Sequence, residues 1–287
     1  MRRFRSYVAI FLILFATLLA VILVEVETSR GQSKSTLKSS EARPSAVARN
    51  ASLQNELEWE FAGKKQRGWY LYVPLIRHLL KTQNDVDTNG FAFAVERWQK
   101  KSGLTPSGVL DKETLFSMIS AWQRLRLKDG SSAQPDQLIT AAPADFYDPA
   151  RLDELRKIEK KTYAAYKRMA AAAVADPSLG LIRNGGGGLA PGEKFLKIVS
   201  AYRSPEYQEQ LRRKSPQAGR AGLALNSPHF TGRALDFYVG GDPVETKDSN
   251  RALQIKTRVY QWLVKNAERF GFRPYFYEPW HWEYVER

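Results

Sequence analysis

The feature that most restricts how this chain can fold is an uncharged apolar segment close to its N-terminus. Residues 7–24 form an unbroken run without a charged side chain, and three arginines precede it. A helix of this length matches the hydrocarbon thickness of a bilayer. Because cationic flanks stay in the cytoplasm, residues 1–28 are predicted to be a cytoplasmic arginine cluster and a signal-anchor helix, with the remainder outside. Cleavage as a signal peptide is the alternative, although the run ends in Glu25-Val26-Glu27 and has no small-residue cleavage site there.

The chain as a whole has a globular composition and an excess of positive charge. It has 287 residues, of which 43% are hydrophobic and 26% charged. Such a composition excludes a disordered, collagenous or multi-spanning protein. Lysine and arginine number 44 against 30 acidic residues, which gives a net charge of +14 and favours polyanionic partners. An exported protein without a nucleic-acid motif is expected to meet anionic cell-wall or lipid polymers, and no nucleic acid.

The patterning divides the exported part into four segments. Residues 29–65 begin with a Ser-, Lys- and Arg-rich stretch that lacks apolar periodicity, which predicts a flexible tether. Residues 66–126 have helical periodicity, and the polar residues 127–147 are predicted to be a connector. Residues 148–287 mix helix and strand patterns. We therefore predict a mixed α+β domain with a small antiparallel sheet flanked by helices, preceded by a small three-helix domain and the transmembrane helix.

The helical segment contains residues that are typical of helix starts and turns. Asp111 can cap a helix, and apolar residues recur at helical spacing before it. The run from Gly90 to Leu104, followed by Gly108-Val109-Leu110-Asp111 and Thr114, resembles the small three-helix peptidoglycan-binding domain of many cell-wall hydrolases. This resemblance implies that the helical domain binds a cell-wall polymer. An ordinary helical bundle with its aromatic residues in the core is the alternative.

Four elements are predicted in the C-terminal segment. Asp148-Pro149 is expected to start a long amphipathic helix that ends near Asp176-Pro177. Residues 195–202 are expected to form a buried strand, and residues 251–270 another helix. A final strand is expected at residues 282–285.

The histidines restrict where metal chemistry can occur. Cysteine is absent, and the three histidines are His78, His229 and His281. His229-x6-Asp236 and Glu278-x-x-His281 supply two imidazoles and two carboxylates in one domain. A catalytic zinc takes three protein ligands and leaves a fourth position for water. We predict that His229, Asp236 and His281 bind one zinc ion, with a turn around Gly232 bringing the first two together.

The remaining polar residues have predicted roles in amide hydrolysis. Glu278 is placed to act as the general base, which takes a proton from activated water and passes it to the leaving amine. Trp280 and Trp282 flank His281 and would exclude water. Arg203 follows the predicted strand and suits a developing oxyanion or a substrate carboxylate.

Three separated motifs carry a family resemblance. They are Ser227-x-His229-x-x-Gly232-x-Ala234-x-Asp236, Glu278-Pro279-Trp280-His281 and Tyr202-Arg203-Ser204-x-x-Tyr207-Gln208. Together, over about residues 190–287, they resemble the zinc D-alanyl-D-alanine carboxypeptidases of the vancomycin-resistance type, with their D,D-dipeptidase and L,D-endopeptidase relatives. The resemblance implies zinc ligands at His229, Asp236 and His281, a base at Glu278, transition-state or carboxylate binding by Arg203, and substrate contacts by Ser227 and Gln208.

The expected function is a membrane-anchored, outward-facing zinc peptidase that trims peptidoglycan stem peptides, with D-Ala-D-Ala as the leading bond. A peptidoglycan D,D- or L,D-endopeptidase is the alternative within the enzyme class. A non-catalytic cell-wall-binding protein is the alternative outside it, but the presence of Glu278 and all three ligand types argues against loss of activity.

Overall fold

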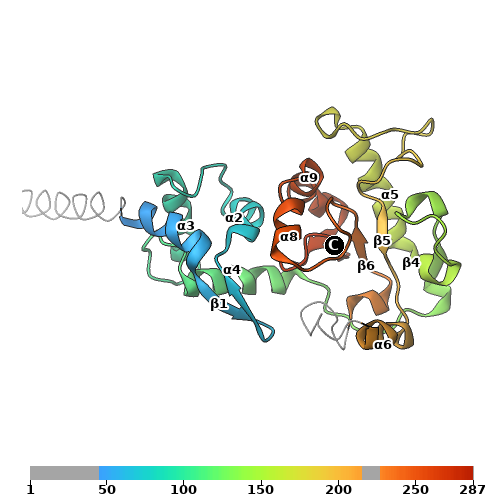
Figure 1. Ribbon diagram of the computed structural model, residues 1–287, viewed down its shortest axis with the longest axis horizontal. Helices are drawn as coiled ribbons and strands as arrows, with labels where there is room; N and C mark the ends of the chain where they lie inside the picture. Colours follow the sequence, from blue (N-terminus) through green and yellow to red (C-terminus); the bar gives the residue numbers. More distant parts are fainter. Residues whose placement is uncertain (1–44, 215–226, 287) are drawn as a thin grey trace, which may run out of the picture.

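The structure is a computed structural model that describes residues 45–214 and 227–286. It combines helices with small antiparallel sheets, which confirms the α+β class. Figure 1 shows an N-terminal helical part on the left and the largest sheet on the right, with α4 running from the first toward the second. Within the described ranges, no helix is long and apolar enough to span a membrane. The predicted span at residues 7–24 lies outside those ranges.

The segment predicted as a tether is partly ordered. Residues 45–56 form a helix, and β1 (Glu58–Phe61) pairs with β2 (Lys64–Arg67) in a hairpin. The prediction of a tether over residues 29–65 is therefore wrong for residues 45–65. The helix is held by long-range contacts: the Asn50 amide donates to Gly108 O (2.9 Å) and accepts from Leu110 N (2.7 Å). Its apolar contacts come from only three residues, Ala46, Val47 and Leu53, which gave little periodicity in the sequence.

Three helices follow, as predicted. They are α2 (Val73–Leu80), α3 (Asn89–Lys101) and α4 (Lys112–Leu125). The Asp111 carboxylate accepts from Thr114 N at 2.9 Å, so the predicted cap is confirmed. A short 3-10 turn, η1 (Tyr70–Tyr72), leads into α2.

The region between the helical part and the main sheet differs from the prediction. A continuous helix from Asp148 is wrong, because α5 (Lys160–Val174) begins twelve residues later, capped by the Glu159 carboxylate. The residues before it form β4 (Lys157–Glu159), which pairs with β3 (Leu138–Thr140), and 3-10 turns. The Arg156 guanidinium fixes one of these turns by donating to Ala141 O, Arg151 O and Asp153. Strand pairing and these bonds outweigh the local helical pattern.

The 3-10 turns of this region are η2 (Pro135–Gln137), η3 (Pro143–Asp145), η4 (Asp153–Arg156) and, after α5, η5 (Pro177–Leu179).

The main sheet has four antiparallel strands in the order β5-β6-β8-β7. The predicted strands at residues 195–202 and 282–285 are present as β5 (Ile198–Ser200) and β8 (His281–Tyr284). The other two are β6 (Ala234–Phe237) and β7 (Phe272–Pro274). All four residues of β6 are buried, because the strand lies inside the sheet and is covered on both faces.

Helices flank this sheet, and one of them is interrupted. The helix predicted over residues 251–270 is divided into α8 (Asp248–Gln254), α9 (Arg258–Asn266) and the 3-10 turn η8 (Ala267–Phe270). Thr257 causes the break between α8 and α9, because its side chain accepts from Tyr260 N at 3.2 Å and so caps α9. The remaining elements are α6 (Pro205–Lys214) and η7 (Pro228–Thr231).

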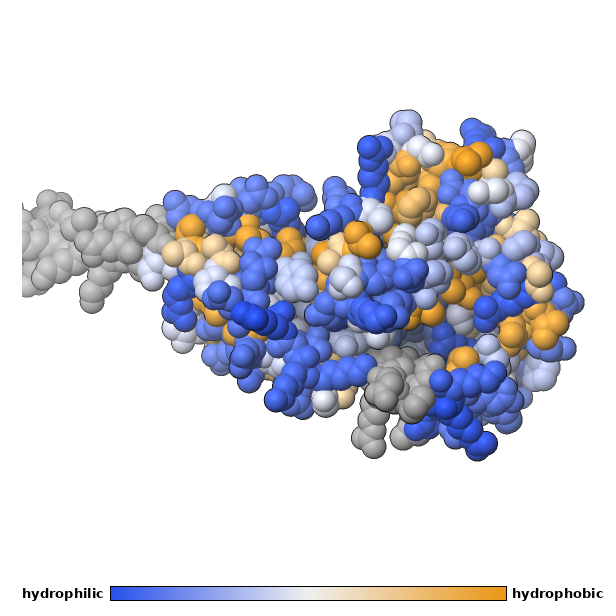
Figure 2. Space-filling view, in the orientation of Figure 1, coloured by the Kyte–Doolittle hydropathy of each residue, from blue (hydrophilic) through white to orange (hydrophobic). Residues whose placement is uncertain are grey.

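The larger of two hydrophobic clusters among the described residues joins the two parts of the chain. Buried residues of the helical part, such as Trp59 and Trp122, belong to the same cluster as Phe276 and Trp282 of the C-terminal part. On the face in Figure 2, hydrophilic side chains predominate and hydrophobic ones come in small groups. The helical part is therefore packed directly on the domain that carries the predicted site.

Candidate metal centre

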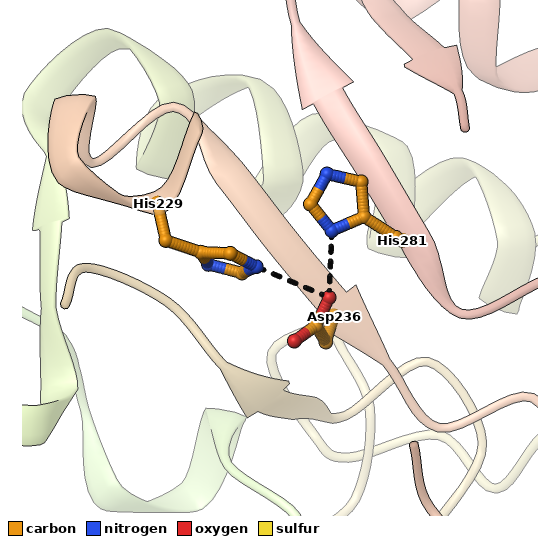
Figure 3. A group of neighbouring side chains, drawn as sticks. All are labelled: His229, Asp236 and His281. Atoms are coloured by element: carbon orange, nitrogen blue, oxygen red, sulfur yellow. Dashed lines mark hydrogen bonds and ion pairs between the residues drawn. The ribbon is translucent and has the colours of Figure 1, made fainter. Parts of the chain in front are cut away.

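His229, Asp236 and His281 converge in the interior of the C-terminal part. They come from η7, β6 and β8, and each side chain is buried. His229 Nε2 lies 3.3 Å and His281 Nδ1 3.0 Å from the same Asp236 Oδ1 (Figure 3). The potential ligand atoms of the three residues all lie within 4.8 Å of one another.

Local backbone structure produces this convergence. Asp236 stands directly opposite His281 in the β6–β8 ladder. His229 is brought to them by the turn predicted at Gly232, which has φ +68° and ends η7. A Cβ on Gly232 would lie 2.9 Å from Glu159 N, so both the conformation and the space require glycine. The Ser227 Oγ caps the same turn by accepting from His229 N at 3.4 Å.

The surroundings of His229 favour a neutral ring with one defined tautomer. Its Nδ1 lies 2.7 Å from Ala201 O. Donation of Nδ1–H to this carbonyl leaves the Nε2 lone pair directed at Asp236. Burial and the positive charge of Arg203 lower the pKa of His229 to about 4. A neutral imidazole with its free nitrogen inside the site has the form of a metal ligand.

Arg203 is part of the same buried cluster. Its Nη2 donates to Asp236 Oδ2 at 2.6 Å, and its Nε donates to Ser200 Oγ at 2.9 Å. The Gln208 amide oxygen, on α6, accepts from Arg203 Nη1 at 3.4 Å. Burial alone would raise the pKa of Asp236, but His229 and Arg203 hold this pKa well below its usual range. Arg203 thus keeps Asp236 ionised and in place.

Glu278 lies in the turn that leads into β8. Its backbone N–H donates to Tyr275 O at 3.2 Å, and its carbonyl accepts from His281 N at 3.0 Å. The turn therefore separates β7 from β8, and Pro279 lies in this irregular segment. The side chain is buried. Burial, with the charge of Asp236, raises the pKa of Glu278 to about 8, against the opposing effect of His281. A buried carboxyl with a raised pKa in such surroundings is typical of a catalytic acid or base.

The donor set fits zinc. Two imidazole nitrogens and one carboxylate oxygen are ligands that catalytic zinc sites use, and here they converge from three elements without a cysteine. Backbone and side-chain partners fix the orientation of each donor. The third histidine, His78, is exposed on α2 and has no part in the cluster.

A comparison with protein families agrees with the geometry of the site. Residues 189–287 match the VanY family model, D-alanyl-D-alanine carboxypeptidase. The family resemblance that the three motifs predict is therefore confirmed for this part of the chain. A solved structure of the LdcB LD-carboxypeptidase is similar over 55% of this chain and 71% of its own, at 24% identity and a TM-score of 0.37. A comparison with curated proteins gave no significant match.

One residue of the site, Glu283, was missed by the sequence analysis. Its Oε1 lies 3.2 Å from His281 Nε2, on the opposite side of the ring from Asp236. Burial alone would raise the pKa of Glu283, but His281 and Arg126 lower it to about 2. Burial would also lower the pKa of His281, yet hydrogen bonds to Asp236 and Glu283 raise it to about 9. The only available signal was the spacing of two along a strand, which puts both side chains on one face.

Proposed function

We propose that this chain is a zinc-dependent peptidase that hydrolyses peptidoglycan stem peptides, with the D-Ala-D-Ala carboxypeptidase reaction as its leading activity. One observation carries the proposal: the buried cluster of His229, Asp236 and His281 falls within the segment that matches a carboxypeptidase family model. In this proposal the three residues hold one zinc ion. Bound zinc supplies Lewis-acid chemistry, polarising a carbonyl oxygen and lowering the pKa of water toward neutrality.

Glu278 is assigned the proton transfers of the reaction. Its carboxylate accepts a proton from the attacking water as the new C–O bond forms, and it later donates that proton to the amine that leaves when the C–N bond breaks. The raised pKa of Glu278 suits both steps, because the group must gain and lose the proton readily near the working pH. Trp280 is buried in the turn before β8 and is assigned to keep bulk water away from this exchange. Trp282 alternates with His281 along β8 and packs against Tyr260 of α9, so the structure does not support the same role for Trp282.

Arg203, Gln208 and Ser227 are assigned to the substrate. Arg203 brings a fixed cation next to the ligand set, where it can stabilise negative charge on the scissile carbonyl or on a terminal carboxylate. Loss of a donor in such a position typically costs about 2.7–4 kcal/mol in the transition state. Gln208 and Ser227 are buried beside Arg203 and His229 respectively, and we assign them contacts with the same substrate.

Defined muropeptides test the reaction and its specificity. The zinc-loaded full-length chain is incubated separately with a pentapeptide monomer, a tetrapeptide monomer and a cross-linked dimer, and the products are weighed by mass spectrometry. Release of one D-alanine from the pentapeptide alone is the expected result. Cleavage of the dimer would identify an endopeptidase, and release from the tetrapeptide would contradict the D,D specificity. A chain that contains zinc and cleaves none of them would support the non-catalytic alternative.

We also propose where the enzyme works. The apolar residues 7–24 support a single-pass membrane anchor with the catalytic part outside the cytoplasm, and the net charge of +14 supports attraction to an anionic wall. The helical domain is assigned to a cell-wall polymer. Protease treatment of intact cells tests the orientation, since only an outward-facing domain is cleaved. Co-sedimentation with insoluble peptidoglycan tests the binding, and failure to sediment would contradict it.

A further inference from the structure

Two residues far apart in the sequence, the partly buried Arg126 and the fully buried Glu283, form an ion pair between the two parts of the chain. Arg126 follows the last residue of α4, and Glu283 lies on β8, 157 positions later. The Arg126 Nε donates to Glu283 Oε1 at 2.9 Å, and its Nη2 contacts the same oxygen. The backbone N–H of Leu127 donates to Glu283 Oε2 at 3.0 Å. Glu283 has no exposed surface, so these donors replace its hydration.

The same carboxylate also contacts a predicted zinc ligand. Glu283 Oε1 lies 3.2 Å from His281 Nε2, while His281 Nδ1 lies 3.0 Å from Asp236. A histidine that donates Nε2–H to a carboxylate presents its Nδ1 lone pair on the other side of the ring. Partners of this kind set the tautomer and the orientation of metal-ligating histidines. The geometry therefore connects α4 to the metal centre through only two side chains.

The helical part also packs on the turn that carries Glu278. Phe276 stacks on Trp122 of α4, with ring centroids 5.9 Å apart and planes at 20°. Phe61 of β1 meets the edge of Phe276 at 4.8 Å. The Arg126 guanidinium lies over the Tyr275 ring, 4.0 Å from its centroid, and Tyr275 N donates to His281 O at 3.0 Å. Residues 275–281 are thus held from one side by the helical part.

We propose that Glu283 is a positioning residue for His281 and that Arg126 holds Glu283 in place, so that the helical part is a structural support of the metal centre. This inference rests on the proposed zinc site. It does not depend on whether the helical part binds a wall polymer. It predicts that changes at the end of α4, outside the domain that matches the peptidase family, weaken metal binding.

Zinc affinity of the full-length chain, measured by competition with a chromophoric chelator, tests the role of Glu283. Glu283→Gln keeps the size of the side chain and removes its charge, and we expect zinc to bind about 10- to 100-fold more weakly. The control variant is Glu286→Gln. Glu286 is a nearby glutamate that pairs with Lys161 at the surface and lies outside the site. Its zinc affinity should equal that of the unchanged chain.

Nitrogen-15 NMR of the imidazole rings separates positioning from general stability. Of the three histidines, His78 is assigned with His78→Ala, and the other two rings are distinguished by the nitrogen that carries the proton, Nδ1 in His229 and Nε2 in His281. In the zinc-loaded protein, His281 should show a protonated Nε2 that exchanges slowly, and Glu283→Gln should speed that exchange or change the tautomer. A folded Glu283→Gln variant with unchanged zinc affinity and His281 signals would overturn the role of Glu283.

Arg126 is tested without altering the residue that contacts His281. Arg126→Ala should weaken zinc binding in the same direction as Glu283→Gln, and Arg126→Lys should recover part of the loss. If Glu283→Gln fails to fold, as judged by circular dichroism, the Arg126 variants carry the test. Equal zinc affinity in folded Arg126→Ala and the unchanged chain would overturn the role of the helical part. If the unchanged chain binds no zinc, the proposed function itself fails. This result differs from failure of the further inference, in which the unchanged chain binds zinc and the variants bind it equally well.

Discussion

Asp236 faces His281 across the β6–β8 ladder, and its Oδ1 lies 3.0 Å from His281 Nδ1 and 3.3 Å from His229 Nε2. Directly opposed residues in an antiparallel pair have Cβ atoms about 4.5–5.5 Å apart, so the register alone brings Asp236 and His281 together. Only His229 needs a special turn to join them. The site is therefore built mainly on sheet geometry, which gives a precise arrangement of donors.

Zinc binding should release protons in a predictable amount. Without metal, the pKa of His281 is raised to about 9 and that of His229 lowered to about 4, so at pH 7 only His281 must lose a proton to become a ligand. We expect release of about one proton per zinc from this residue at pH 7. Calorimetry in buffers of different ionisation enthalpy measures the number. Glu278→Gln serves as the reference, because Glu278 is also protonated at this pH and can add to the release. If the enthalpy of zinc binding is the same in all buffers, no proton is released, and the protonated state assigned to His281 is contradicted.

The metal-free protein should lose stability as the pH rises. The folded pKa of His281 is raised from 6.5 to about 9, so its stabilising effect is complete below the lower value and is lost as the pH rises through the higher one. The pKa of Glu278 is also raised, from 4.5 to about 8, and its ionisation destabilises the fold in the same direction. Melting temperatures of the chelator-treated chain should therefore be lower at pH 9 than at pH 6, and less so in Glu278→Gln. A higher value at pH 9 would contradict these shifts.

Gly232→Ala should destabilise the fold and displace His229. The new Cβ would meet Glu159 N at 2.9 Å in a left-handed conformation. Gly63→Ala is the matched control, since Gly63 also has a positive φ (+80°) but no atom within 4 Å of the added carbon. Backbone strain alone costs about 1–3 kcal/mol, so Gly63→Ala reports that part and Gly232→Ala should cost more. Denaturant titration measures both, and equal losses would show that the contacts of the added carbon with Glu159 and Leu138 are unimportant.

Much of the fold could be predicted from local patterns. Asp111 indicates its helix through a cap, an apolar, β-branched run indicates β5, and a strand-like pattern at residues 282–285 indicates β8. Gly232 indicates the turn between two site residues. The errors have long-range causes. The helix at residues 45–56 depends on Asn50 bonding a loop 58 positions away, and the pattern after Asp148 yields to strand pairing.

In the candidate site too, residues with a local pattern could be predicted, whereas a residue that depends on a long-range contact could not. His229, Asp236, His281 and Glu278 were predicted from residue type and spacing; the structure brings the first three into one cluster, and all four are buried. Glu283 was not predicted, because its function depends on Arg126 from another part of the chain. The spacing of two from His281 puts Glu283 on the same face of β8, but spacing alone does not show which residue pairs with the carboxylate. Contacts between distant segments are the information that a local pattern lacks.

Glu278 should be needed for hydrolysis but not for holding zinc. Glu278→Gln removes the proton acceptor while keeping the size of the side chain, so hydrolysis of the pentapeptide should fall by at least about 100-fold, the lower range for a general base. Zinc content should remain unchanged, because Glu278 is not among the three proposed ligands. Retained activity in this variant would show that another group takes the proton.

The most direct test of the account is the zinc content of the full-length chain after saturation with zinc and removal of excess metal. We predict one tightly bound zinc per chain, and loss of that zinc in each of His229→Ala, Asp236→Ala and His281→Ala, while His78→Ala retains it. A folded chain that binds no zinc, or one that keeps its zinc after all three ligand substitutions, would contradict the metal centre on which the proposed function depends.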